Sequence, residues 1–273
     1  MIGMALALTL QSAAGVSLEP VWETDGFSQP ESVAWSDETG FLYVSNIAGE
    51  PAGADDDGFI SRVHADGRIE TLRWAETGLS APKGLAIAGD RLFVTDITAI
   101  AVFDLQTGAL ISRHPVEGAG FLNDALALDD GSVLVSDSVT GRIHRLAEGA
   151  VTLWLEGELL SAINGLYQHD GTLFAVTMRD RFLEIDMDSR AVTVRATGIA
   201  SGDGLAPLPG GRWLANEWPG RLFVIGADGT VETLEDTRET GSLMNDFILV
   251  EGRLYMAHLR AGTVSARDVR EMN

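Results

Sequence analysis

The stretch "FLNDALALDDGSVLVSD", residues 121–137, contains the unit from which the rest of the chain is built. An Asn-Asp pair precedes an apolar strand, an Asp-Asp-Gly turn follows it, and a second apolar strand ends at Asp137. Asp-Gly pairs between apolar runs indicate a β-hairpin, because glycine takes positive φ angles without steric cost. One polar pair at a strand edge is ordinary turn chemistry. Its meaning therefore depends on whether the chain repeats it.

The chain repeats this unit six times. The first-strand segments are "PESVAW" (30–35), "PKGLAI" (82–87), "LNDALA" (122–127), "INGLYQ" (163–168), "GDGLAP" (202–207) and "MNDFIL" (244–249). Their second residues are separated by 52, 40, 41, 39 and 42 positions, and each segment is followed by a tight turn and further strand-like runs. Four short antiparallel strands in each of six repeats predict an all-β fold, a six-bladed β-propeller.

The sixth repeat has no fourth strand of its own, whereas a strand-like piece at residues 16–26 precedes the first repeat. Because an open sheet edge invites aggregation, we expect residues 16–23 to form the outer strand of the last blade. The propeller would then occupy residues 16–273.

Residues 1–15 would form a signal peptide or a disordered tail. The apolar run of residues 2–10 resembles the later part of a secretory signal, although the basic leading segment is missing. It is too short to span a bilayer. The sequence favours a periplasmic or secreted protein, and the alternative is a cytoplasmic protein with a mis-assigned start codon or a disordered tail.

The composition argues against several classes of binding partner and metal site. The formal charge of −21 argues against nucleic acid and against anionic membranes, since both require clusters of Lys and Arg. The absence of cysteine excludes disulfides and Cys-ligated metals. The sequence also lacks the G-x-S-x-G, H-E-x-x-H, Walker and G-x-G-x-x-G motifs.

Strand direction places two sets of polar residues at one mouth of the central channel. The inner set, at the starts of the first strands, is Glu31, Lys83, Asn123, Asn164, Asp203 and Asn245. The second set, at the ends of the second strands, is Asn46, Asp96, Asp137, Thr177, Glu217 and His258. Oxygen donors dominate the inner set, which suits a hard divalent cation, most naturally calcium, better than zinc.

The order of these motifs resembles the senescence marker protein/gluconolactonase (regucalcin-like) family, which is related to the paraoxonases. The resemblance covers residues 16–270. It implies that Glu31, Asn164 and Asp203 bind a divalent metal, that Asn123 contacts the substrate or a metal-bound water, and that Asp203 is the general base.

Two features depart from that family's pattern. The usual Glu-Gly-Pro of the first blade is replaced by "PESVAW", which keeps Glu31. Lys83 introduces an ammonium that would repel a metal or bind a substrate carboxylate; pointing to solvent or pairing with Asp96 or Glu31 is the alternative. The first repeat also carries about twelve extra residues at 47–58, on the face of the polar sets, where a loop covers the mouth and selects substrates.

The sequence thus predicts a calcium-dependent hydrolase of lactones or related esters. Asn123, Lys83, Asn245, Glu217 and His258 are the predicted substrate-binding residues, with Met178 and Trp218 as wall residues or ordinary packing between blades. The alternatives are a non-catalytic propeller that binds a ligand or protein, and a metal-dependent phosphotriesterase-like hydrolase.

Overall fold

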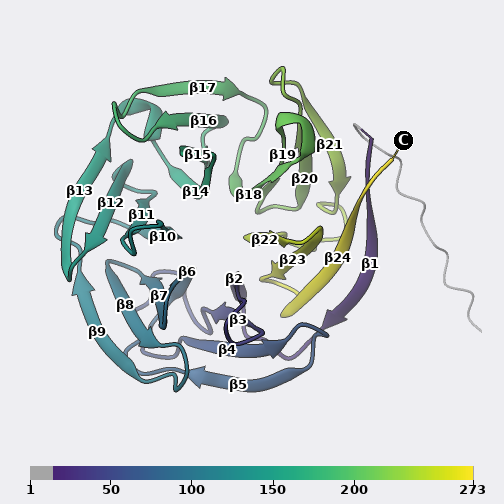
Figure 1. Cartoon of the computed structure of the whole chain (residues 1–273). Coiled ribbons are helices and arrows are strands. Elements are labelled where there is room, and N and C mark those ends of the chain that lie inside the picture. Colours follow the sequence, from purple (N-terminus) through teal and green to yellow (C-terminus); the bar gives the residue numbers. More distant parts are fainter. Residues whose placement is uncertain (1–14, 273) are drawn as a thin grey trace, which may run out of the picture.

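The computed structural model describes residues 15–272, which form six four-stranded antiparallel sheets around one axis (Figure 1). The prediction of a six-bladed β-propeller is confirmed. The apolar run at residues 2–10, on which the export prediction rests, lies outside the described residues.

The strands follow one another from the axis outward in each of the first five blades. Blade one consists of β2 (Pro30–Ser36), β3 (Phe41–Asn46), β4 (Phe59–His64) and β5 (Ile69–Ala75). Blade two consists of β6 (Pro82–Ala88), β7 (Arg91–Asp96), β8 (Ala99–Asp104) and β9 (Leu110–Pro115). Blade three consists of β10 (Leu122–Ala127), β11 (Val133–Asp137), β12 (Arg142–Ala147) and β13 (Ala150–Glu156).

Blade four consists of β14 (Ile163–His169), β15 (Thr172–Thr177), β16 (Arg181–Asp186) and β17 (Val192–Ala196). Blade five consists of β18 (Gly202–Leu208), β19 (Arg212–Glu217), β20 (Arg221–Ile225) and β21 (Val231–Asp236). Blade six consists of β22 (Phe247–Val250), β23 (Arg253–His258), β24 (Thr263–Glu271) and β1 (Val16–Thr24). The helices of the described part of the chain are two 3-10 turns, η1 (Glu158–Leu160) and η2 (Pro209–Gly211).

The ring closes through β1, which pairs with β24 in antiparallel register from Val16↔Glu271 to Thr24↔Val264. The first strand of the described chain therefore supplies the outer edge of the last blade, as predicted. Val16 and Leu18 are buried in an apolar cluster that also contains residues of blade five. Closure thus contributes both ladder hydrogen bonds and apolar burial.

The hydrophobic core is divided into six clusters, one between each pair of neighbouring blades. Tyr43 of blade one packs with Leu92 and Phe103 of blade two, and the other five interfaces follow the same pattern. Removing these apolar faces from water is the main stabilising contribution to a stack of twisted sheets.

Blade closure leads to a prediction about truncation. A variant lacking residues 1–14 keeps every described pair of the β1–β24 ladder and is expected to unfold at the temperature of the full chain. A variant lacking residues 1–24 loses β1, leaves β24 as an open edge and is expected to melt lower and to aggregate. Thermal unfolding and light scattering measure both effects, and equal stability of the two variants would contradict the role of β1.

Candidate active site in the channel mouth

Each of the first five inner strands carries a backbone irregularity at its predicted site residue. The register of β10 with β11 shifts between Leu122 and Ala125, and the same shift occurs in β2, β6, β14 and β18. Such a bulge breaks the strict alternation of side chains. In blade three, Asn123 faces one cavity of the channel and the next residue, Asp124, faces another.

In blades one, three and five, a side chain of the second strand replaces a ladder hydrogen bond that the bulge removes. The hydroxyl of Ser136 accepts a hydrogen bond from the Asp124 N–H at 2.9 Å, and Asn216 Oδ1 accepts from the Gly204 N–H at 2.7 Å. In blade six the backbone departs further. The Asp246 N–H donates to the carbonyl of Glu31 in blade one, so β22 begins only at Phe247.

All six residues of the predicted inner set line one cavity of about 370 Å³. Its remaining lining is mostly apolar: Ile47, Pro51, Phe121, Met178, Trp218, Leu243 and Leu259. Met178 and Trp218 are therefore wall residues, and Trp218 is 41% exposed at the rim. An apolar pocket with a few convergent polar groups is the usual form of a small-molecule site.

Two buried carboxyl groups face this cavity. Burial raises the pKa of Glu31 to about 8, while the Lys83 ammonium opposes the shift and Asp246 adds to it. Burial, followed by the charges of Glu31 and Asp246, raises the pKa of Asp203 well above its ordinary value. Asp203 Oδ1 accepts a hydrogen bond of 2.7 Å from Asn164 Nδ2, which joins blades four and five.

The oxygen atoms of Glu31 and Asn164 in this cavity are suited to bind a divalent cation. Glu31 Oε2 is buried and has no hydrogen-bond partner among the described residues. Asn164 uses its amide nitrogen on Gly202 O and Asp203 Oδ1, which leaves its amide oxygen for another group. Because no three His, Cys, Asp or Glu side chains of residues 15–272 gather closely enough to hold a metal, amide oxygens would have to complete the ligand set.

Lys83 does not point to solvent, and it forms no ion pair with any residue that the structure describes. Its side chain is 2% exposed, and its ammonium donates to the carbonyls of Pro51 (2.8 Å) and Ala81 (2.9 Å). The nitrogen also lies 4.3 Å from the centroid of the Phe121 ring. Burial lowers the pKa of Lys83, and the charges of Glu31 and Asp96 oppose that shift.

The extra loop between β3 and β4 reaches the cavity, as predicted from its length. Pro51 lines the cavity and is tied to Lys83 through its carbonyl. Farther along, Asp56 exchanges hydrogen bonds with the hydroxyl of Ser80. The loop is thus attached at two points to the segment that enters blade two.

The second predicted set lies behind the cavity wall and has a structural role. Asp137 accepts hydrogen bonds from the backbone N–H groups of Gly120 (2.8 Å) and Phe121 (3.0 Å), and in this way fixes the loop that carries Phe121. Asp96 does the same for Ser80 and Ala81. Each of these carboxylates anchors the loop that leads into its own blade.

Glu217 and His258, predicted as substrate-binding residues, do not line the cavity. Glu217 accepts from the Ala200 N–H and forms a two-pronged ion pair with Arg221 at 2.7 and 2.8 Å. His258 is bonded through Nδ1 to Leu243 O and through Nε2 to the Ser265 hydroxyl. Their polar groups are already engaged, so the structure brings neither of them to the site.

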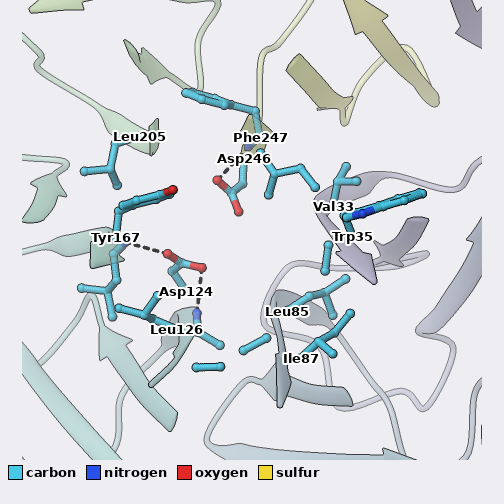
Figure 2. Close-up of a pocket in the computed structure, with 16 residues that line it drawn as sticks. Val33, Trp35, Leu85, Ile87, Asp124, Leu126, Tyr167, Leu205, Asp246 and Phe247 are labelled. Atoms are coloured by element: carbon cyan, nitrogen blue, oxygen red, sulfur yellow. Dashed lines mark hydrogen bonds between the residues drawn. The ribbon is translucent and has the colours of Figure 1, made fainter. Parts of the chain in front are cut away.

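Sequence reasoning missed two further carboxylates in the channel. Asp124 and Asp246 point into a second cavity of about 260 Å³, which the later parts of the inner strands line (Figure 2). Burial raises the pKa of Asp246 to about 6 and that of Asp124 well above its ordinary value. The Asn-Asp pairs at 123–124 and 245–246 were the available signal.

These carboxylates connect neighbouring blades. Asp124 Oδ2 accepts from the Leu166 N–H of blade four at 2.6 Å, and Asp246 Oδ2 accepts from the Ser32 hydroxyl of blade one at 2.8 Å. Four carboxyl groups whose pKa values are raised, first of all by burial, therefore lie along one channel.

Solved structures with the same fold include two enzymes. A gluconolactonase of Xanthomonas campestris has 15% sequence identity and a TM-score of 0.68, over 98% of this chain and 93% of that chain. A virginiamycin B lyase of Staphylococcus aureus has 13% identity and a TM-score of 0.66, over 93% of this chain and 99% of that chain. At this identity the likeness establishes the propeller alone.

No protein-family model matches the sequence, and no curated protein sequence shows significant similarity to it. Within residues 15–272, no helix has the length and apolar character needed to cross a membrane.

The raised pKa values predict how stability depends on pH in cation-free protein. Between pH 4.5, the ordinary pKa of Glu31, and about 8, the native state binds more protons than the unfolded state. The free energy of unfolding is therefore expected to fall as pH rises through this window. Glu31→Gln should make the fall between pH 6 and 8 shallower, because it removes one of the four buried carboxyl groups whose raised pKa values produce it.

Urea unfolding in the presence of EDTA at several pH values measures this dependence. The exposed Glu232→Gln, on the outer strand β21, is the matched control and should keep the slope of the parent. A parent whose stability is flat or rises over pH 6–8 would contradict the assignment of a buried, proton-binding Glu31.

Proposed function

We propose that this protein is a divalent-cation-dependent hydrolase of lactones or related esters, with calcium as the natural cation, acting in the 370 Å³ mouth cavity. The observation that carries the proposal is the buried, unpartnered Oε2 of Glu31 in a cavity that also contains Asn164 and Asp203. The gluconolactonase of the same fold supports the reaction class, and the senescence marker protein/gluconolactonase resemblance supports the residue roles.

Glu31, Asn164 and Asp203 would hold the cation through oxygen atoms. A cation bound there would polarise the substrate carbonyl and stabilise the negative charge that develops on its oxygen.

Asp203 is the proposed general base. A water oxygen attacks the lactone carbonyl carbon while Asp203 accepts one of the water protons. The ring C–O bond then breaks, and its oxygen takes up that proton to give the open hydroxy acid. A carboxylate whose pKa is raised toward the working pH is a stronger base than an exposed one, and burial raises the pKa of Asp203.

The surrounding residues orient the base and the substrate. Asn164 holds Asp203 Oδ1 through its amide N–H and so directs the other carboxylate oxygen. Asn123, which donates to the Ser138 hydroxyl at 3.2 Å, and Asn245, which accepts from the Leu259 N–H, present fixed amide groups to the substrate. Phe121, Met178 and the other apolar walls limit the access of bulk water.

Cation binding predicts a change in thermal stability. EDTA-treated protein is expected to melt at a lower temperature than the same protein in excess calcium, because a ligand of the native state stabilises it by mass action. The effect is roughly 4 kcal/mol at a thousandfold excess over Kd. Glu31→Gln should respond much less than Glu232→Gln in a melting series against calcium, and a parent that ignores added calcium and other divalent cations would disprove the cation assignment.

Removing the base predicts a loss of turnover. Asp203→Asn keeps an oxygen ligand but removes the charge and the proton acceptor, so kcat on lactones is expected to fall by roughly a hundred- to ten-thousandfold at saturating calcium. Glu217→Gln is the control, because it weakens a buried ion pair outside the cavity and should lower the melting temperature more than kcat. Near-normal turnover in Asp203→Asn would exclude it as the base, and inactivity of the parent on lactones, esters and phosphotriesters would favour a binding protein.

A further inference from the structure

Lys83 is the only lysine in the chain: the other eighteen basic residues counted with it are arginines. It is also the one basic residue among those that line the mouth cavity in the described part of the chain. The chain therefore places its single lysine, almost fully buried, at its candidate active site.

The ammonium of Lys83 has neutral partners. It donates to the carbonyls of Pro51 and Ala81 and lies over the face of the Phe121 ring. Among residues 15–272, no carboxylate oxygen lies within 4 Å of its nitrogen. An ammonium has three N–H donors, so one remains without a protein acceptor. A buried charge is costly unless it is paired, and an anion in the cavity would pair this one.

Lys83 and the catalytic carboxylate lie on opposite sides of the channel. Lys83 belongs to β6 of blade two and Asp203 to β18 of blade five, and these blades face each other across the axis (Figure 1). A substrate with its carbonyl beside Asp203 and Asn164 would extend its far end toward Lys83.

We propose that Lys83 binds a carboxylate of the substrate, so that the preferred substrates are lactones or esters that carry a carboxylate at the end remote from the reacting carbonyl. The inference rests on the proposed hydrolase function and names its substrate class.

The charges around Lys83 permit an anion to bind. Asp96, whose charge also acts on Lys83, is already occupied by Arg113 at 2.8 Å and by the Ser80 and Ala81 N–H groups. A cation held by Glu31 and Asp203, the two carboxyl groups that face the cavity, would neutralise their charges. The incoming carboxylate would then meet the Lys83 ammonium with no uncompensated carboxylate opposite it.

The first test compares two lactones of nearly equal shape, 5-oxotetrahydrofuran-2-carboxylate and 5-oxotetrahydrofuran-2-carboxamide. The parent is expected to prefer the carboxylate about ten- to a hundredfold in kcat/KM, as a charge-assisted hydrogen bond implies. Lys83→Met should bring the ratio of the two kcat/KM values close to one. Lys83→Arg keeps the charge and should retain part of the preference. A parent that hydrolyses the carboxamide equally well overturns the role of Lys83 and leaves the hydrolase proposal standing.

The second test does not depend on turnover. Tetrahydrofuran-2-carboxylate and its carboxamide lack the reactive carbonyl, and calorimetry compares their binding to the parent, Lys83→Met and Lys83→Arg. Protein labelled with ¹⁵N at the lysine side chain gives a signal from Lys83 alone, and that signal should shift with the carboxylate and not with the carboxamide. Selective binding without any lactone hydrolysis would disprove the hydrolase and uphold the anion site. Equal or absent binding of both probes to a folded parent would overturn the anion site.

Discussion

Crowding at the axis is the constraint on which the rest of the molecule depends. Six inner strands converge on one narrow channel, and at several points a side chain does not fit between them. A Cβ on Gly165 would lie 2.0 Å from the carbonyl oxygen of Asp203, and one on Gly84 would lie 2.5 Å from the Cα of Asp124. The position after the site residue is therefore glycine in three blades.

The bulges follow from the same crowding. They separate the residues that face the mouth from the residues that bond to a neighbouring blade. Each bulge turns one residue toward the mouth, and in blades one, three and five a side chain of the second strand accepts from the backbone N–H group that the bulge releases. Where the next residue is not glycine, it bonds to a neighbouring blade, as Asp124 and Ser32 do. In blades one and three, the residue that faces the mouth and the residue that bonds to a neighbouring blade are thus consecutive in one strand.

The sequence was sufficient for the blade count, the closing strand and the six mouth residues, because a repeat of about forty residues fixes which positions are equivalent. It did not predict that Glu217 and His258 lie outside the cavity. Their alignment at the ends of second strands is correct, but strand position does not reveal whether a polar group faces a cavity or the N–H groups of an adjoining loop. Asp124 and Asp246 were missed because a bulge overrides the alternation on which a strand pattern relies. The sequence left the orientation of the Lys83 side chain open, because one of its carbonyl partners, Pro51, lies in a loop whose path no pattern predicts.

The pairing of β1 with β24 also has a consequence for biosynthesis. The closing strand leaves the ribosome before every other strand of the propeller, whereas its partner residues, 264–271, follow all the other strands. Five blades can assemble while the chain grows, but the ring stays open until residues 264–271 have been synthesised. Contacts between such distant segments form slowly, since loop closure must come before any stabilising contact. During that interval β1 is an unpaired strand, and its residues Glu19 and Glu23 place charge along an edge that would otherwise attract other chains.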